Sequence, residues 1–363
     1  MPVSNRLLPL IRVAGTHYEI GRGIGAAAMH QCHAMVTEHR RMLVSDLGCE
    51  YNVALDIIRP YLGLDCPELA WVLQEMQGIA DGARLSIEDV WLVNCWEELV
   101  WELRRARRDL HCTTLAAAGR ATADGHTLLG HNEDWRPSDL DNVYLVHARP
   151  EGTPALLALG YGPTLVNTGL NAAGVGQGCD SLFMTDQRLG LPRVVVARIV
   201  LAARSLSEAI SAAIHPQRAA GYNHLIADAH GQLVNVEVTG SDYDLLWAGE
   251  GFLVHTNDYQ SPRLQARQQD LPRLIGSRLR SQRAWHLLKD AWGMLTLDVL
   301  QAVLADHANA PHSICCHPYA DQGPAVFQSQ TIASLVMDLS ELRLRAAWGP
   351  PCQAVYHDYR LAN

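Results

Sequence analysis

The sequence changes character at Cys112, and this change limits the folds open to the chain. Residues 17–103 carry long stretches with apolar side chains at helical spacing. From Cys112 onward, short apolar runs separated by turn signals dominate. Cys112 itself opens a run of small residues that suit a strand, Cys112–Ala118. We therefore predict an α+β fold in which two antiparallel sheets pack between layers of helices.

The predicted elements follow this division. Helices are expected over residues 18–47, 67–81 (with Pro67 in its first turn), 87–103, 193–214 and 276–304. Strands are expected over 112–118, 127–130, 143–148, 155–159, 225–227, 233–238, 245–247, 252–255, 331–337 and 342–348.

Composition excludes several classes of protein. The chain has 363 residues, 48% of them hydrophobic, and can bury one large core or two ordinary ones. The formal net charge is −9 and neither side of Cys112 is basic, so nucleic acid is a poor candidate partner. No apolar stretch approaches the roughly 18 residues of a membrane span, and the start lacks a signal peptide. We expect a cytoplasmic protein that does not bind membranes.

The cysteines favour the same compartment. There are nine, an odd number, at positions 32, 49, 66, 95, 112, 179, 315, 316 and 352. Their spacing suits reduced, mostly buried thiols, and we predict no disulfide. Cys315-Cys316-His317 suggests a metal ligand set, but adjacent cysteines do not easily bind one tetrahedral zinc and no second pair follows at the usual spacing. We therefore predict no metal site.

Cys112 is a candidate nucleophile. A thiol must lose its proton to attack a carbonyl, and a free α-amine on the same residue, with a pKa of about 7.7–8.0, is a base suited to that task. Cys112 has such an amine only if the peptide bond between His111 and Cys112 is cut. The short basic run Arg104–Arg108 just before this point is expected to be a solvated linker, which is also what an exposed processing loop requires.

Several motifs, taken in chain order, resemble the acyl-coenzyme A:6-aminopenicillanic-acid acyltransferase family of self-processing N-terminal-nucleophile hydrolases. They lie at residues 15–21, 94–99, 112–114, 130–135, 169–175, 255–257, 313–315, 331–339 and 349–352. The resemblance implies a four-layer αββα sandwich. It also implies that residues 1–111 are a helical pro-segment or small subunit and that residues 112–363 form the catalytic large subunit.

The resemblance also assigns roles to individual residues. It implies that Cys112 attacks the carbonyl of His111 during processing and later accepts the acyl group. Asp134 matches a carboxylate beside the nucleophile, where it would hold or orient the α-amine; the alternative is a turn aspartate that caps a backbone amide. Asn257 matches an asparagine that stabilises the oxyanion.

Other residues are assigned less specifically. Thr114, Asn132 and Asn171 are expected in the substrate or oxyanion neighbourhood, although Asn171 more often builds a hairpin turn in such a context. Glu19, Glu97 and Glu98 match family positions and are expected to pair with the strand-rich part.

The chain departs from the family at two positions. His111 stands where the family usually has glycine, and Cys316 where it often has arginine. Glycine tolerates a strained scissile peptide better than histidine does, so cleavage is expected to be slower or to be helped by the imidazole. If the arginine helps to bind substrate or the amine, another residue must supply that cation.

The expected function is a self-cleaving cysteine amidase or acyltransferase. Its substrate would be an N-acyl or acyl-thioester small molecule, with a coenzyme A thioester as one possibility and with no metal or redox cofactor. Its partners would be this substrate and its own cleaved 1–111 fragment. The alternative is a noncatalytic binding protein that keeps the fold and stays uncut, and the sequence leaves open hydrolysis against transfer, the acyl group and the oligomeric state.

Overall fold

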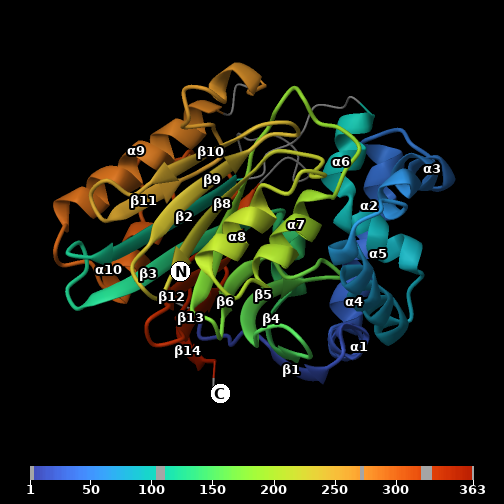
Figure 1. The fold of residues 1–363 in the computed structure, drawn as a ribbon, viewed down its shortest axis with the longest axis horizontal. Coiled ribbons are helices and arrows are strands. Elements are labelled where there is room, and N and C mark those ends of the chain that lie inside the picture. The colour runs from blue at the N-terminus through green and yellow to red at the C-terminus, as the bar shows by residue number, and fades with distance from the viewer. Residues whose placement is uncertain (1–3, 104–110, 270–273, 320–328, 362–363) are drawn as a thin grey trace.

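Two β-sheets stack face to face in the computed structural model of this chain (Figure 1). The structure describes residues 4–103, 111–269, 274–319 and 329–361. Strands β2 and β3 of the first sheet contact strands β7 and β8 of the second, so the two inner faces form a shared core.

The first sheet has six strands, all paired antiparallel. Their order across the sheet is β11 (Phe252–His255), β2 (His111–Gly119), β3 (Gly125–Trp135), β12 (Gln330–Asp338), β13 (Arg343–Trp348) and β14 (His357–Arg360).

The second sheet has eight strands. Their order is β1 (Leu10–Gly15), β4 (Val143–Pro150), β5 (Leu156–Tyr161), β6 (Thr168–Asn171), β7 (Val175–Ser181), β8 (Tyr222–Asp228), β9 (Leu233–Val238) and β10 (Tyr243–Trp247). The β1–β4 pair is parallel, and the other pairs of this sheet are antiparallel.

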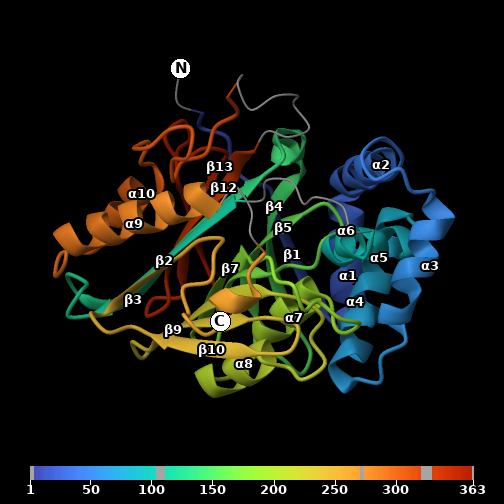
Figure 2. The same ribbon diagram turned by 90° about the horizontal axis from the view of Figure 1, so that it is seen from above.

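Helices cover both outer faces. Helices α9 (Leu274–Asp290) and α10 (Leu297–Leu304) pack on the six-stranded sheet, whereas α7 (Arg193–Val200) and α8 (Leu206–Ala213) lie on the eight-stranded side, where α8 contacts β8 and β9 (Figure 2). The order of layers is helix, sheet, sheet, helix. This confirms the predicted α+β class and the αββα sandwich that the resemblance implied.

The N-terminal helices gather at one end of the sandwich (Figures 1 and 2). They are α1 (His17–Ala27), α2 (Met29–Ser45), α3 (Tyr51–Leu62), α4 (Pro67–Ala83), α5 (Ile87–Asn94) and α6 (Trp96–Glu102). Buried residues of these helices and of α7 belong to one apolar cluster, so segments before and after residue 112 share a core. Helix α4 contacts α7 directly.

The sheets approach closely at two glycines of β7. A Cβ at Gly176 would lie 2.6 Å from Leu339 Cδ2, and one at Gly178 would lie 2.5 Å from Thr114 Cγ2. Every residue of Val175–Ser181 is buried. The polar, glycine-rich sequence of β7 therefore reflects packing between two sheets, which explains why it lacks the alternation expected of a strand.

Some predicted boundaries are wrong. The helices expected over 18–47, 87–103, 193–214 and 276–304 are each two helices, because Ser205 and Thr296 begin new helices as N-caps, Ala28 separates α1 from α2, and Cys95 separates α5 from α6. Helix α3 and strands β1, β6, β7 and β14 were not predicted.

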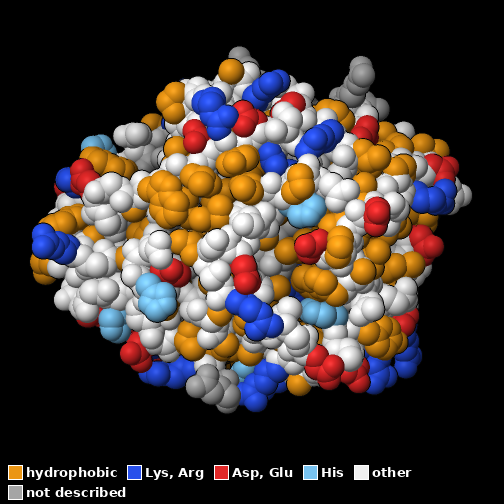
Figure 3. Space-filling model, viewed as in Figure 1, with side chains coloured by type: hydrophobic (Ala, Val, Ile, Leu, Met, Phe, Trp, Pro, Cys, Tyr) orange, Lys and Arg blue, Asp and Glu red, His pale blue; other side chains and the backbone are white. Residues whose placement is uncertain are grey.

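The surface carries both signs of charge. On the face seen in Figure 3, acidic and basic side chains are interspersed among apolar ones. Within the described ranges, no helix has both the length and the apolar character needed to cross a bilayer.

Candidate active site

Cys112 is the second residue of β2, and its side chain is buried with 4% of its surface exposed. The pairing of β11 with β2 sets Leu253 opposite Ala116 and His255 opposite Thr114. Continuing that register beyond the end of β11 brings Asn257 to the level of Cys112. The backbone N–H of Cys112 donates to Asn257 Oδ1 at 2.9 Å.

Asn257 is itself held from three sides. Its Nδ2 donates to the carbonyl of Ser181 at 3.1 Å, and its backbone N–H donates to Ser277 Oγ at 2.8 Å. Arg280 Nη2 donates to the same Oδ1 at 2.7 Å. An amide nitrogen carries two hydrogens, so among the described residues one N–H of Asn257 is left without an acceptor and can donate to a ligand.

Arg280 places a buried guanidinium beside the candidate nucleophile. It belongs to α9, is 2% exposed, and its Nη2 lies 3.5 Å from the carbonyl oxygen of Cys112. The sequence left open which residue supplies a cation where Cys316 replaces the family's arginine. In this fold the guanidinium of Arg280, on α9, is a cation beside the Cys112 backbone.

Asp134 lies opposite His111 in the β2–β3 register and is fully buried. Its Oδ1 accepts a hydrogen bond from Thr331 at 2.5 Å, while Oδ2 has no partner among the described residues. Burial raises the pKa of Asp134 to about 7, although the Thr331 hydroxyl and the Arg280 charge oppose the rise. The Asp134 backbone lowers the pKa of the Cys112 thiol, but this effect is smaller than the opposing effects of burial and of the nearby carboxylates.

The strand predicted over 127–130 is longer than expected, because β3 continues through Trp135, and the turn considered as the alternative for Asp134 is not observed. Gly130 marks no turn and pairs with Val336 of β12. A side chain at Gly130 would come within 3.2 Å of Leu304, which accounts for the glycine. Asp134 is therefore a strand residue whose side chain accepts from a neighbouring strand, and it does not cap a turn.

The Cys112 thiol is not activated in the continuous chain. Burial and the carboxylates of Glu133, Asp180 and Asp134 raise the pKa of Cys112 well above its usual value. Cys112 Sγ, a ring nitrogen of His131 and a carboxylate oxygen of Glu133 lie within 4.8 Å of one another. This group offers proton acceptors for a thiol that needs one.

A chain of buried polar groups leads away from this point between the sheets. His131 Nε2 lies 3.0 Å from Glu133, and its Nδ1 lies 2.9 Å from Thr114 Oγ1, which donates to Asp180 at 2.9 Å. Burial alone would lower the pKa of His131, but the hydrogen bond to Glu133 and the nearby carboxylates raise it. Thr114 thus lies one hydrogen bond behind His131, as a link in this chain.

Asn132 and Asn171 lie elsewhere. Asn132 Nδ2 donates to the carbonyls of Leu304 and Ile314, and its Oδ1 accepts from Ser334, so the side chain faces the helix layer. Asn171 Oδ1 accepts from the backbone of Ala173 and Val175 in the turn between β6 and β7. The expectation of a substrate contact is not met for these two residues, and the hairpin alternative for Asn171 is the one observed.

A cavity opens beside Cys112 and draws its walls from both parts of the chain. Its lining is apolar and aromatic with a few acidic and basic groups. Residues before position 112 supply Met35, His39, Val93, Asn94, Trp96, Glu97 and Glu98; residues from 112 onward supply Cys112, Glu133, Trp135, Tyr161, Thr164, Ser181, Arg193, Val194 and Tyr222. The N-terminal helices are therefore part of the pocket.

Two of the three glutamates expected to pair with the strand-rich part do so. Glu98 Oε1 accepts the backbone N–H of Arg193 at 3.0 Å, and Glu97 lies 3.7 Å from the Arg193 guanidinium. Burial raises the pKa of Glu98. Glu19 instead forms a capping box with Thr16 at the start of α1.

Four residues of this site were not predicted from the sequence. His131 and Glu133 stand inside the 130–135 motif that also contains Asp134, so their position beside Asp134 could have identified them as candidate site residues. Arg193 and Arg280 lie on helices with no motif of their own. The side chain of His111 and residues 104–110, with the basic run, lie outside the described residues.

The sequence matches the family described as "Acyl-coenzyme A:6-aminopenicillanic acid acyl-transferase" over residues 121–353. This range includes Asp134 and Asn257 and begins after Cys112. A relative described as the acyl-coenzyme A:6-aminopenicillanic-acid-acyltransferase 40 kDa form of Emericella nidulans is 27% identical over 253 residues, which are 67% of this chain and 66% of that protein. An uncharacterized protein of Archaeoglobus fulgidus is 24% identical over 296 residues, or 73% of this chain and 48% of that protein. The chain thus spans about half of one relative and just under two thirds of the other.

Solved structures with a partial likeness include a variant of conjugated bile acid hydrolase from Clostridium perfringens. Its TM-score is 0.46 at 15% identity, covering 69% of this chain and 97% of that chain. Penicillin V acylase from Agrobacterium tumefaciens gives a TM-score of 0.47 at 13% identity, covering 65% and 83%.

Proposed function

Because this chain belongs to the acyl-coenzyme A:6-aminopenicillanic acid acyl-transferase family, we propose that it is a self-processing cysteine amidase or acyltransferase. Cys112 is the nucleophile of both its maturation and its turnover. One observation carries the proposal: Asn257 and Arg280 converge on the backbone of Cys112, at 2.9 Å and 3.5 Å, beside a cavity lined by aromatic side chains.

Maturation begins with attack of Cys112 Sγ on the carbonyl carbon of His111. The thiol proton passes to the His131–Glu133 group, the His111–Cys112 C–N bond breaks, and the nitrogen takes up a proton to become the free α-amine. The product is a thioester between His111 and Cys112 Sγ. Water then hydrolyses it, leaving a carboxylate on His111 and a free thiol on Cys112.

Turnover repeats the attack on an external acyl group. The α-amine of Cys112 accepts the thiol proton and gives it to the leaving amine or thiol. The remaining N–H of Asn257 is placed to donate to the oxyanion, while its Oδ1 holds the α-amine and Arg280 keeps the asparagine in position. Asp134 carries a negative charge above a pH of about 7 and orients the α-ammonium electrostatically.

The lining of the cavity favours an apolar or aromatic acyl group, although side chains must move apart to admit one, because the cavity volume is about 30 Å³. Trp96, Trp135, Tyr161 and Tyr222 offer ring faces and edges, and Met35 can adapt to the shape of the acyl chain. The acyl donor is an N-acyl amide or a thioester such as a coenzyme A derivative. Water or an amine releases the acyl group, according to which acceptor reaches the thioester.

The decisive experiment measures what remains of the chain after purification. Under denaturing conditions we expect two fragments, 1–111 and 112–363, and Edman sequencing of the larger one should begin with Cys112. The Cys112→Ala variant should stay whole, whereas Cys179→Ser, a change at another buried thiol, should still cut. A wild-type chain that stays whole after long incubation would instead support the uncut binding protein.

A further inference from the structure

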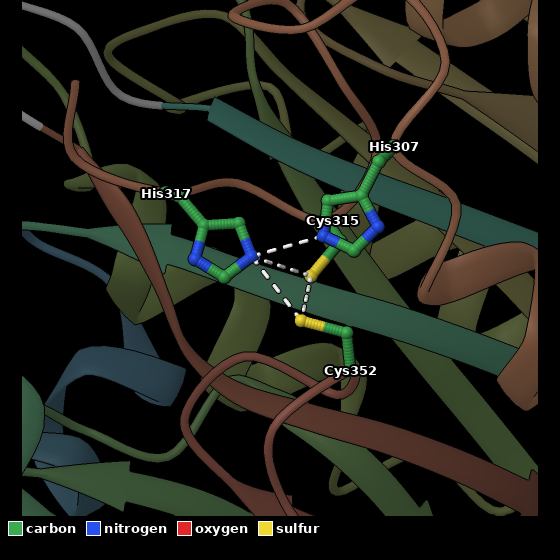
Figure 4. Close-up of side chains that lie close together, drawn as sticks. All are labelled: His307, Cys315, His317 and Cys352. Atoms are coloured by element: carbon green, nitrogen blue, oxygen red, sulfur yellow. Dashed lines mark hydrogen bonds between the residues drawn. The ribbon is translucent and has the colours of Figure 1, made fainter. Parts of the chain in front are cut away.

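Four side chains converge outside the active site: His307, Cys315, His317 and Cys352 (Figure 4). His317 Nε2 lies 3.0 Å from His307 Nε2, 3.4 Å from Cys315 Sγ and 3.2 Å from Cys352 Sγ. The two sulfurs are 3.6 Å apart. All four ligand atoms lie within 4.8 Å of one another.

Hydrogen bonding alone does not account for this arrangement. A neutral imidazole nitrogen either donates one hydrogen or accepts at one lone pair, and here three polar atoms crowd around His317 Nε2. Four atoms that each offer a lone pair to a common centre are the arrangement that a cation requires. The sulfur separation is also far longer than the roughly 2.05 Å of a disulfide.

We propose that these four residues bind one zinc ion as a closed Cys₂His₂ site. Tetrahedral zinc with Zn–S of about 2.3 Å and Zn–N of about 2.0–2.1 Å holds its ligand atoms roughly 3.3–3.8 Å apart. Four of the six separations, at 3.0–3.6 Å, reach this range after small shifts, and the two between His307 and the sulfurs lie within 4.8 Å. Binding releases two thiol protons, and two thiolates balance the charge of Zn²⁺.

The site draws its ligands from two loops. His307, Cys315 and His317 lie in the segment between α10 and β12, whereas Cys352 follows β13. The first loop is anchored to α9, because Arg283 donates twice to Asp306 at 3.1 and 2.7 Å. Zinc would fasten the two loops together, and with all four positions filled by protein its role would be structural.

Cys316 points away from this cluster. Its thiol faces the carbonyl of Ser329 at 3.3 Å, and its backbone N–H donates to Thr331 Oγ1 at 3.1 Å. The objection that adjacent cysteines cannot share one zinc therefore does not apply, since Cys315 alone enters the site. Thr331 also donates to Asp134, so the zinc-bound segment supports a hydrogen bond of the candidate active site, a consequence that rests on the proposed function.

The experiment measures zinc per chain by elemental analysis after growth with added zinc and purification without chelators. We expect about one zinc per chain in the wild type and almost none in Cys352→Ser or His317→Ala. Cys316→Ser and Cys112→Ala are the matched controls and should keep the metal. Circular dichroism checks that each variant is folded.

Cobalt substitution gives a second readout on the wild-type protein. Co²⁺ in this site should show thiolate-to-metal charge transfer and the visible bands of tetrahedral coordination, and zinc should displace it. Zinc-free wild-type protein, zinc retained by Cys352→Ser, zinc lost only with Cys112→Ala, or a Cys315–Cys352 disulfide in the mass spectrum would each overturn the site. None of these measurements depends on catalytic activity, so failure here leaves the proposed function standing.

Discussion

The backbone N–H of Cys112 donates to the side-chain oxygen of Asn257 at 2.9 Å, so the asparagine faces the candidate nucleophile with its acceptor. The resemblance implied only a donor to the oxyanion. The same side chain can fill both roles, because Oδ1 and the second N–H of Nδ2 lie at one end of a planar amide. In the continuous chain it holds the start of β2, and in the cleaved enzyme that we propose Oδ1 would accept from the α-ammonium.

Two substitutions at Asn257 separate these roles. Asn257→Ala removes both the acceptor and the donor, and kcat should fall by about 10²–10³ if the oxyanion loses a hydrogen bond. Asn257→Asp keeps the acceptor for Cys112 and Arg280 but has no N–H. We expect kcat to fall in both variants and to fall further in Asn257→Ala, which also loses the acceptor for Cys112 and Arg280, while KM changes little. Near-wild-type turnover by Asn257→Asp would leave Asn257 as a positioning residue only.

Asp134 should impose a pH dependence near neutrality. Because burial raises its pKa to about 7, the carboxylate that orients the α-ammonium forms only as the pH rises through that value. Turnover should increase across this pH range. Asp134→Asn should abolish this increase with pH, and it should also slow processing. Thr331→Val should move the midpoint to higher pH, because the Thr331 hydroxyl lowers this pKa. If the midpoint of the pH profile were unchanged in Thr331→Val, a group other than Asp134 would be the cause of the pH dependence.

The same shift affects stability in a defined direction. The folded-state pKa of Asp134 lies above the usual 3.8, so its favourable contribution is full below pH 3.8 and is lost as the pH rises through about 7. Asp134→Asn has no ionisable group at this position, so the variant does not lose this stability as the pH rises. Its melting temperature should therefore exceed that of the wild type more at pH 8 than at pH 5. Equal differences at both pH values would contradict the raised pKa.

Strands could be predicted from the sequence where apolar and polar residues alternate or where the strand contains a run of apolar residues. Strand β9 was predicted to the residue, and β12 within one residue at each end, because both are apolar and bounded by turns. Strand β7 was missed, since its glycines are dictated by Leu339 and Thr114 across the sheet interface. That constraint comes from tertiary packing and leaves no local signal.

The site was also only partly predictable from the sequence. Asp134 and Asn257 were found because they stand in motifs, and the structure brings Asn257 to the backbone of Cys112 and Asp134 opposite the preceding residue, His111. Arg280 was missed, since a lone arginine on a helix has no sequence signal until α9 is placed over β2. The absence of a metal site was predicted from local spacing, whereas the cluster proposed above joins Cys315 to Cys352 across β12 and β13.

The N-terminal segment should stay bound after cleavage, and its contacts include a buried ion pair. Arg198 of α7 donates to both oxygens of Glu75 of α4, at 2.9 and 2.7 Å, with each side chain 1% exposed. Arg198→Met should destabilise the protein by about 3–5 kcal/mol, because Glu75 keeps a buried charge that has lost the guanidinium and retains the contact with His17 Nδ1 at 3.2 Å. Urea unfolding of the uncut Cys112→Ala background measures this without fragment dissociation.

The control for that experiment is a double variant. Glu75→Gln combined with Arg198→Met removes both charges and should recover most of the lost stability. Arg59→Met breaks an exposed pair, with Arg59 68% and Asp56 69% exposed, and should change little. If the double variant were as unstable as Arg198→Met, the loss would come from packing and not from the buried charge of Glu75.

The reaction class can be read from the acyl-enzyme. A thioester on Cys112 is open to water unless a second substrate excludes it, so a panel of small N-acyl compounds should show amide hydrolysis, and transfer should appear when an amine acceptor is added. Rapid acid quenching should trap the acyl group as added mass on the 112–363 fragment. Iodoacetamide should abolish activity by alkylating Cys112, which peptide mapping can distinguish from reaction at Cys352, a partly exposed thiol. Activity that survives alkylation of Cys112 would show that the chemistry uses another centre.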